Sequence, residues 1–135
     1  MNIFGIGTDI VSVNRIKNSL KNKNFIYRIF NEKEILKCKK TNNRTNCFAK
    51  RFAAKEAFSK ALGTGISNGI NFNEIVILNN KSGKPYISII GQTKKIFNKK
   101  LKRKKSKISL SLSDEKKYAV AFVTISLWRK IKFFT

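Results

Sequence analysis

The sequence predicts an α+β fold in which a mainly antiparallel sheet packs against helices. The first observation is that stretches with apolar residues at helical spacing occur together with short β-branched runs. The second is that two pairs of these runs are joined by short turn segments, "NKSG" and residues 114–117. Strands joined by hairpins pair antiparallel, and helices beside such a sheet define the α+β class. At 135 residues, 41% of them hydrophobic, the chain fits one domain with a real core.

The N-terminal part contains a predicted strand followed by two predicted helices. The strand covers residues 2–7, and the first helix begins after Ser12, which we expect to be its N-cap. The second helix, "NEKEILKCKK", begins with Asn31 as the expected N-cap. Glu34 lies three residues further on, where its side chain can complete a capping box. This role gives Glu34 a structural explanation.

The sequence of the remaining part predicts one long helix, then a hairpin, a shorter helix and a second hairpin. The long helix runs from about Thr45 to Leu62 and ends at Gly63. The later elements are strands within 73–80 and 84–91, a basic helix within 92–102, and two strands within 107–126. We find no internal repeat, no low-complexity linker and no domain boundary in this order.

The formal net charge of +23 predicts anionic partners or substrates, because such a field attracts phosphates and acidic surfaces. A lysine-rich, solvated surface would give the same composition without any partner. The run "KKLKRKKSK" at 99–107 is the strongest candidate for a nucleic-acid patch. It has no interleaved aromatic residues and no helix-turn-helix or RNP-like motif beside it, so a nucleic-acid-binding module remains an alternative supported by charge alone.

The two cysteines and the absence of apolar spans bear on the compartment. Cys38 and Cys47 lie nine positions apart in a chain without His, which is neither zinc-ligand spacing nor a disulfide framework. We therefore expect two free thiols. No stretch of about 18 uncharged apolar residues occurs, and the N-terminus lacks the pattern of a secretory signal. The sequence predicts a cytoplasmic protein.

Glu56 occupies an unexpected place in a chain with 30 basic and only 7 acidic residues. At 100° per residue it projects from the same arc of the long helix as Phe48 and Phe52. One interpretation is an i,i+4 ion pair with Lys60 on a half-exposed stripe. The other is a ligand for a cation at the base of a cleft, because a buried charge must be paired or bind metal.

Asp9 is a second acid that the local pattern leaves unexplained. It follows "FGIGT", whose two glycines allow a close backbone approach and the presentation of a side chain at a sheet edge. The "GIGTDI" segment lacks the third glycine of a dinucleotide-binding fingerprint, so a Rossmann site is excluded. A turn or helix-cap role for Asp9 is as compatible with the sequence as a site.

Four motifs in this order closely resemble the holo-[acyl-carrier-protein] synthase family, the short type of 4′-phosphopantetheinyl transferase. They are "GIGTDIVSVNRI", "KRFAAKEAFSKALGTGI", "NKSGKPYI" and "SLSDEKKYAVAFV". The likeness covers about residues 2–126. It implies one domain over 1–126 followed by a basic, aromatic tail over 127–135. It also implies an Mg²⁺-dependent enzyme of fatty acid biosynthesis that moves the phosphopantetheine arm of coenzyme A onto a serine of apo acyl carrier protein.

The resemblance assigns roles to particular residues. Asp9 and Glu56 match the family's metal-binding acids, and Mg²⁺ takes one or two carboxylates together with substrate phosphates. Lys60 matches a lysine of the motif that would stabilise the transferring phosphate. The remaining coenzyme-binding candidates are Gly63, Gly65 and Lys84.

The resemblance also implies partners, and it leaves the general base open. Arg15 matches a basic position of the first helix on which the family docks the acidic carrier protein, and the family is typically a homotrimer with active sites between subunits. Many members carry His where this chain has Ser109 or Asp114. Because the chain has no His, a His-based mechanism is out of reach here. Asp114 and Glu115 are candidates for the base, and an acidic turn is the alternative.

Overall fold

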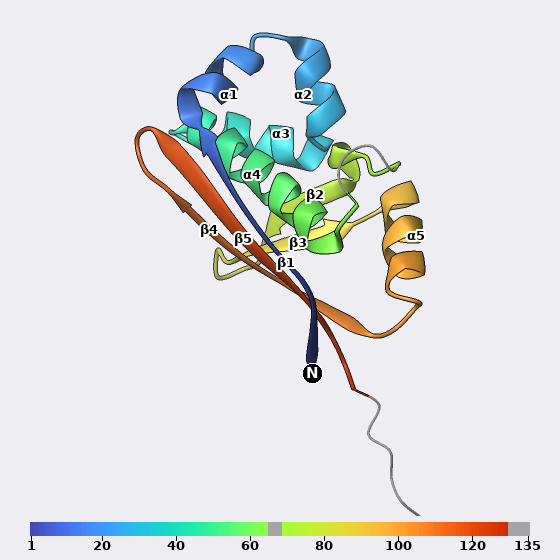
Figure 1. Ribbon diagram of the computed structural model, residues 1–135. Coiled ribbons are helices and arrows are strands. Elements are labelled where there is room, and N and C mark those ends of the chain that lie inside the picture. The colour runs from blue at the N-terminus through green and yellow to red at the C-terminus, as the bar shows by residue number, and fades with distance from the viewer. Residues whose placement is uncertain (65–68, 130–135) are drawn as a thin grey trace, which may run out of the picture.

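The computed structural model describes residues 1–64 and 69–129 and confirms the α+β class (Figure 1). A three-stranded sheet has the order β1-β5-β4, and β2 and β3 form a separate hairpin. All pairs are antiparallel. The elements are β1 (Asn2–Ser12), α1 (Val13–Ser19), α2 (Lys23–Ile29), α3 (Glu32–Lys39), α4 (Arg44–Leu62), a 3₁₀ turn (Phe72–Glu74), β2 (Ile75–Asn79), β3 (Pro85–Ile89), α5 (Gly91–Lys100), β4 (Ser106–Asp114) and β5 (Tyr118–Leu127). None of the described helices is long and apolar enough to cross a membrane.

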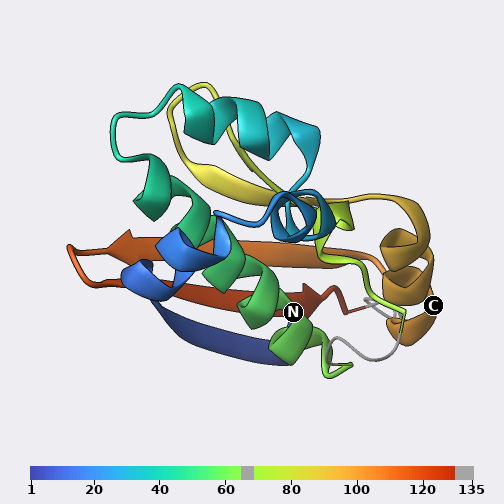
Figure 2. The same ribbon diagram turned by 90° about the horizontal axis from the view of Figure 1, so that it is seen from above.

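The long helix α4 is the centre of the molecule. Figure 2 shows it between the three-stranded sheet on one side and α3 with the β2–β3 hairpin on the other. Buried residues, most of them alanine and phenylalanine, lie on nearly all sides of α4. Ala53, Ala57 and Phe58 are fully buried. A helix that is buried on nearly all sides lies inside a protein rather than on its surface. The position of α4 therefore fixes the geometry of every element that packs against it.

The two glycines of "GIG" let β1 lie directly against the α4 backbone. A Cβ atom at Gly5 would lie 1.8 Å from the carbonyl oxygen of Ala61, and one at Gly7 would lie 1.8 Å from that of Ala57. No other residue type allows this approach, because any side chain would enter the helix backbone. The glycines predicted for a close backbone approach thus serve the contact between strand and helix.

Several predicted helix ends are confirmed. The Ser12 side chain accepts a hydrogen bond from the Arg15 backbone N–H at the start of α1. Asn31 and Glu34 form the reciprocal capping box of α3. Gly63 ends α4 in the left-handed conformation, with a φ of 81°. These features depend only on neighbours within four residues, which is why local sequence reveals them.

Two elements differ from the sequence-based expectation. β1 continues to Ser12 instead of ending near residue 7, because it pairs with β5 along its whole length, from Asn2↔Leu127 to Ser12↔Tyr118. The helix α2 was not predicted. Its apolar residues Phe25, Ile26 and Ile29 pack against the core but are only partly buried. Its N-cap Asn22 accepts from the backbone N–H of Asn24.

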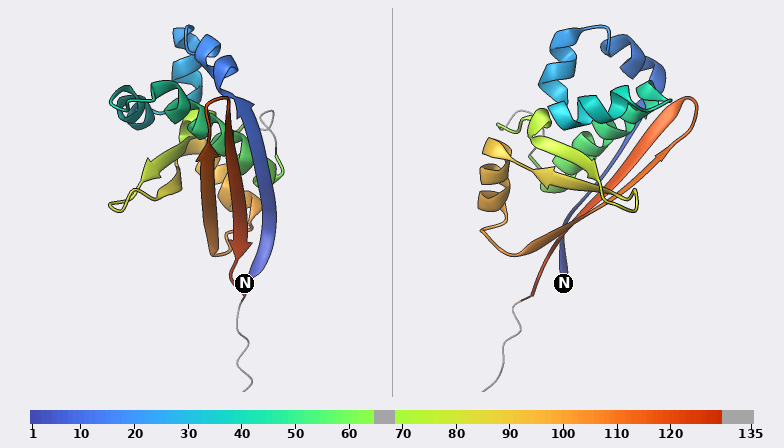
Figure 3. Two further views of the ribbon diagram at one scale, coloured as in Figure 1. Left: turned by 90° about the vertical axis from the view of Figure 1, so that its left-hand side faces the viewer. Right: turned by 180° about the vertical axis from the view of Figure 1, so that it is seen from behind.

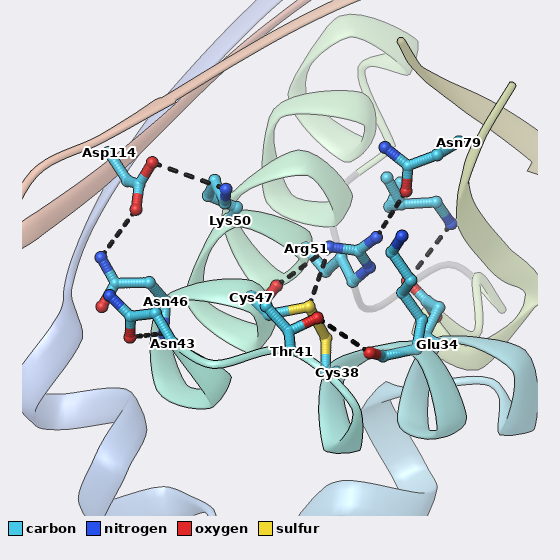
Figure 4. The surroundings of a disulfide bond; sticks show 12 residues. Glu34, Cys38, Thr41, Asn43, Asn46, Cys47, Lys50, Arg51, Asn79 and Asp114 are labelled. Carbon is cyan, nitrogen blue, oxygen red and sulfur yellow. Dashed lines mark hydrogen bonds and ion pairs between the residues drawn. A yellow bond between two sulfur atoms is a disulfide. The ribbon is translucent and has the colours of Figure 1, made fainter. Parts of the chain in front are cut away.

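The prediction of two free thiols is wrong. Cys38 and Cys47 form a disulfide with a Cα–Cα distance of 5.4 Å (Figure 4). The last turn of α3 and the first turns of α4 lie side by side after a short connection, which brings the two side chains together. Residue spacing alone does not reveal this, since it carries no information on how two successive helices pack.

A buried ion pair also joins α3 to α4. Lys55 Nζ lies 2.7 Å from Glu34 Oε1, and both side chains are fully buried. The same ammonium donates to the carbonyl oxygens of Phe72 and Ile75, while Glu34 Oε2 accepts from the Ile77 backbone N–H. Burial lowers the pKa of Lys55 to about 8, although the Glu34 charge raises it. Glu34 is therefore both a helix cap and the partner of a central lysine.

Candidate functional site

Asp9 faces α4 from the middle of the edge strand β1. Residues at intervals of two share one face of a strand, so Asp9 lies on the same side as Gly5 and Gly7, which contact α4. Its side chain is 17% exposed. The structure assigns the N-cap of α1 to Ser12, and Asp9 is a paired strand residue opposite Ala121. The turn or cap interpretation of Asp9 is therefore wrong.

Lys60 connects Asp9 to the last turns of α4. Its Nζ lies 3.2 Å from Asp9 Oδ1 and donates to the Thr8 carbonyl oxygen at 2.9 Å. The Lys60 side chain is 55% exposed, so the ammonium remains open to an additional anionic group. In the described part of the chain the ion pair of Lys60 is thus with Asp9 across the strand–helix contact, rather than with Glu56 one turn away.

Glu56 is half-buried and belongs to the same electrostatic cluster. Burial raises the pKa of Glu56, and the negative charge of Asp9 raises it further, while Lys60 and Arg15 lower it. The charges of Asp9, Lys60 and Arg15 are thus near enough to influence the Glu56 carboxyl. The chain therefore gathers two carboxylates and two cations from β1, α1 and α4.

The pair of carboxylates fits a hard divalent cation. Among the described residues no group of three or more His, Cys, Asp or Glu side chains is gathered around one point. Two acids are nevertheless the protein contribution expected for Mg²⁺, which keeps several waters and takes its other ligands from phosphates. Burial and the Asp9 charge both raise the pKa of Glu56, and a bound cation would favour its ionised form. Asp9 and Glu56 are thus the residues that fit a metal ion.

The remaining coenzyme-binding candidates lie in different parts of the chain. Gly63 follows Lys60 at the end of α4, and its carbonyl oxygen accepts from Lys100 Nζ at 3.5 Å. Gly65 lies outside the described residues. Lys84 is exposed in the turn of the β2–β3 hairpin, which lies on the opposite side of β4 and β5 from β1 (Figure 3, left). Within one chain, therefore, Lys84 does not join the cluster around Asp9.

Asp114 lies at the opposite end of α4 from this cluster. Its carboxylate accepts from Asn46 Nδ2 at 2.7 Å and lies 3.5 Å from Lys50 Nζ. Asn46 precedes Glu56 by ten residues, which is about 15 Å along the helix axis. The neighbouring Glu115 accepts from the Lys117 backbone N–H in the β4–β5 turn. Within one chain, then, neither Asp114 nor Glu115 lies beside Glu56, where a general base for the transfer would be needed.

Comparison with known proteins places this arrangement in a family. A family model described as the 4′-phosphopantetheinyl transferase superfamily matches residues 5–123, which include every described element from β1 to most of β5. The chain belongs to the 4′-phosphopantetheinyl transferase superfamily. The resemblance seen in the four sequence motifs is thereby confirmed.

Relatives within the superfamily carry one name. A holo-[acyl-carrier-protein] synthase of Pelagibacter ubique is 51% identical over 125 residues, covering 93% of this chain and 98% of the relative. The crystal structure of the Neisseria meningitidis synthase has a TM-score of 0.81 and 40% identity, and the match covers 92% of this chain and 98% of that one. The Bacillus anthracis synthase in complex with CoA (3′,5′-ADP) has a TM-score of 0.77 and 36% identity, covering 95% and 100%. None of these matches favours the nucleic-acid-binding alternative.

Some features of this candidate site in the phosphopantetheinyl transferase chain could not be seen in the sequence. The Thr8 carbonyl oxygen that holds Lys60 is a backbone group, so no side-chain pattern marks it. The proximity of Arg15 to Glu56 requires α1 to pack beside α4. The glycine spacing before Asp9 was the one available signal, because it indicated that another backbone lies close to this face of β1.

Proposed function

We propose that this chain is an Mg²⁺-dependent holo-[acyl-carrier-protein] synthase. It transfers the 4′-phosphopantetheine group of coenzyme A to a serine of apo acyl carrier protein, releases adenosine 3′,5′-bisphosphate and serves fatty acid biosynthesis. Relatives with this name, one of them in complex with CoA (3′,5′-ADP), support the activity. The observation that carries the proposal is the cluster of Asp9, Glu56 and Lys60 at the β1–α4 contact.

Each residue of the cluster has a defined task in this reaction. Asp9 and Glu56 would hold Mg²⁺, which supplies positive charge to the pyrophosphate oxygens of coenzyme A. Lys60, fixed by Asp9 and the Thr8 carbonyl, presents an ammonium that stabilises negative charge on the transferring phosphoryl group. Gly63, directly beyond Lys60, offers backbone without a side chain to the coenzyme. Gly65 and Lys84 remain proposed coenzyme-binding residues.

In the transfer, the serine oxygen of the carrier protein forms a bond to the phosphorus attached to the pantetheine arm. The bond between that phosphorus and the bridging oxygen of the pyrophosphate breaks, and adenosine 3′,5′-bisphosphate leaves with the electron pair. The chain must therefore hold two phosphates and an incoming hydroxyl in line. The serine proton passes to a carboxylate, a lysine or water, since the chain has no His.

The acidic acyl carrier protein is proposed to dock on α1. Arg15 is exposed on this helix and lies close enough to Glu56 to lower the pKa of that carboxyl. A carrier protein bound at Arg15 would thus present its serine beside the proposed metal site. The net charge of +23 favours encounter with an acidic partner.

A homotrimer is proposed from the outer face of the sheet. The face of β1 and β5 that points away from α4 exposes large apolar side chains, namely Ile6, Ile10, Tyr118, Val120 and Phe122. An apolar surface of this kind marks an interaction site in a protein.

Two broader assignments belong to the same proposal. The transferase domain comprises residues 1–126, and residues 127–135 form a basic, aromatic tail of which Leu127 still ends β5. The protein acts in the cytoplasm.

The activity is tested by incubating the protein with coenzyme A, Mg²⁺ and an apo acyl carrier protein and measuring the intact mass of the carrier. The proposal expects the mass of one phosphopantetheine arm to be added. An unchanged carrier mass with every divalent metal tried would refute it.

A further inference from the structure

The Cys38–Cys47 disulfide has a charged neighbour on one of its two sulfurs. Arg51 Nη1 lies 3.2 Å from Cys47 Sγ and also donates to the Cys47 carbonyl oxygen at 3.3 Å (Figure 4). Arg51 Nη2 donates to Asn79 Oδ1 at 2.9 Å, which holds the guanidinium in this orientation. The contact is one-sided, since the hydrogen bond from Arg51 goes to the sulfur of Cys47.

The two cysteines also occupy opposite ends of helices. Cys38 lies in the last turn of α3, where the helix dipole disfavours negative charge. Cys47 is the fourth residue of α4, at the end where the dipole favours negative charge. Helix N-termini and neighbouring arginines are the two features that stabilise a cysteine thiolate in proteins. Both are present at Cys47, and the helix end at Cys38 acts in the opposite direction.

The surroundings of Arg51 would favour a nearby anion. It is 4% exposed, and its Nε is buried without a hydrogen-bond partner among the described residues. Burial lowers the pKa of Arg51, and the Glu34 charge raises it, yet a guanidinium stays protonated in proteins. The intact disulfide offers this buried cation only a weak sulfur acceptor. A thiolate on Cys47 would give it a full negative charge.

We propose that Cys38 and Cys47 form a thiol–disulfide redox site that exchanges with low-molecular-weight thiols, and that Cys47 carries the thiolate in the reduced form. This site is independent of the proposed transfer reaction. Disulfides in proteins of the cytoplasm are usually transient or redox-sensing rather than permanent. Because the surroundings favour a thiolate on Cys47 and not on Cys38, we expect an incoming thiol to attack Cys38 and release Cys47.

The exchange proceeds in two steps with glutathione as the reductant. A glutathione thiolate attacks Cys38 Sγ, the S–S bond breaks, and Cys47 leaves as a thiolate beside Arg51, because the sulfur with the more stable thiolate leaves faster. A second glutathione thiolate attacks the glutathione sulfur of the mixed disulfide. Glutathione disulfide is released, and the Cys38 thiolate takes up a proton. In total, two glutathione thiols are oxidised, and the products are Cys38 thiol, Cys47 thiolate and one proton.

The surroundings of Arg51 are basic, and the disulfide itself is buried. Cys38 is fully buried and Cys47 is 4% exposed, so exchange requires local opening. A cavity of about 290 Å³ borders Arg51 and Asn79, and Lys33, Lys37 and Tyr86 also line it. Lys33 and Lys37 of α3 add positive charge to the surroundings of Arg51. Glu34 is the acidic group that faces Arg51 within this surrounding.

The thiolate assignment is tested with two matched single-cysteine variants, Cys38→Ser and Cys47→Ser. The ultraviolet absorbance of the thiolate, recorded against pH with circular dichroism as the folding control, gives the pKa of the remaining cysteine. We expect a pKa below about 7.5 for Cys47 in Cys38→Ser, and about 8.5 or higher for Cys38 in Cys47→Ser. Equal values, or a lower value for Cys38, would overturn the assignment.

The exchange equilibrium is tested on the wild-type chain in glutathione buffers. Because one proton is released, the equilibrium constant for reduction should rise with pH, by up to about tenfold per pH unit, between the pKa of Cys47 and that of the glutathione thiol. Arg51→Gln should lower this constant at least about tenfold near neutral pH, while Lys50→Gln, which removes a cation one residue away, should change it little. A constant independent of pH, or equal effects of the two variants, would contradict a thiolate held by Arg51. If Arg51→Gln fails to fold, the single-cysteine titrations decide the matter with Arg51 intact.

Discussion

The ammonium of Lys60 lies 3.2 Å from the carboxylate of Asp9, and this ion pair joins the middle of β1 to the last turns of α4. The two residues are 51 positions apart, so the pair exists only because Gly5 and Gly7 let the strand lie on the helix backbone. The Thr8 carbonyl completes the contact. The position of Lys60 relative to Asp9 and Glu56 is therefore set by backbone packing rather than by local sequence.

Replacing Lys60 by Gln should lower turnover with little effect on the stability of the fold. The ion pair is partly exposed, so its loss should change the free energy of unfolding by less than about 1 kcal/mol. The loss of a cation from the transferring phosphate should lower turnover by about 10²-fold. Thermal unfolding and carrier-protein modification are measured on the same sample. Lys95→Gln, a neutralised lysine exposed on α5, should leave both unchanged; a similar loss of turnover there would refute a specific role for Lys60.

The ionisation of Glu56 should govern the acid limb of the pH–rate profile. Its pKa is raised by burial and by Asp9, and the metal requires the deprotonated carboxylate. The rate should therefore rise with pH through a value above that of an ordinary Glu, and additional Mg²⁺ should move this limb to lower pH because metal and proton compete. An acid limb insensitive to Mg²⁺ would argue against Glu56 as a ligand.

The electrostatic coupling between Asp9 and Glu56 can be measured without turnover. In the metal-free protein, Asp9→Asn should lower the pKa of Glu56, because it removes a neighbouring negative charge, but burial should keep it above the ordinary value. Carbon NMR of the side-chain carboxyl groups reports this shift. Glu32→Gln, on the exposed first turn of α3, is the control and should leave it unchanged. No shift in Asp9→Asn would mean that the two acids do not share a site.

Gly7→Ala should damage both the fold and the site. The added Cβ would lie 1.8 Å from the Ala57 carbonyl oxygen, so β1 must move off α4 and carry Asp9 with it. We expect a loss of about 3 kcal/mol in the free energy of unfolding together with a loss of turnover. Gly83→Ala is the matched control, since its Cβ would meet no atom within 4 Å and only its φ of 88° is unfavourable. That variant should cost about 1–2 kcal/mol and keep its activity. Normal turnover in Gly7→Ala would show that the close contact is unnecessary.

Arg15→Glu should weaken recognition of the carrier protein. Like charge at a docking surface costs up to several kcal/mol, so the KM for the carrier should rise by about tenfold or more while that for coenzyme A changes little. The assays should be run at a pH well above the acid limb of the pH–rate profile, because Arg15 also lowers the pKa of Glu56. Lys99→Glu, within "KKLKRKKSK", is the control with the same change in net charge. Equal increases in the KM for both substrates in Arg15→Glu would contradict docking at α1.

Local patterns predicted much of this fold, and long-range contacts explain the rest. The capping box of Asn31 and Glu34 and the glycine stop at Gly63 were predicted because their hydrogen bonds join near neighbours. Glu34 shows the limit of this reasoning. Its capping role is confirmed, yet the same carboxylate also holds the fully buried Lys55 from another helix. Nothing in the spacing of "NEKEIL" distinguishes a surface cap from one that pairs with a lysine in the core.

The functional roles of the candidate site residues stay predictions. Asp9, Glu56 and Lys60 were selected from the motif, and the structure brings them together at one contact. The i,i+4 alternative for Glu56 was reasonable on helical spacing, but it could not take into account a strand that passes over the same helix face. The disulfide was missed for the same physical reason, because the pairing of Cys38 with Cys47 depends on how α3 packs against α4.

The proposed role of Glu56 in the transfer is tested by the intact mass of an apo acyl carrier protein after reaction with coenzyme A and Mg²⁺, measured in parallel for wild type and Glu56→Gln. Both proteins should show the same circular dichroism, since Glu56 is only half-buried and Gln has nearly the same volume. We expect the wild type to add one phosphopantetheine arm to the carrier and Glu56→Gln to add none in the same time. An unmodified carrier with the wild type, or equal modification by both proteins, would contradict this expectation.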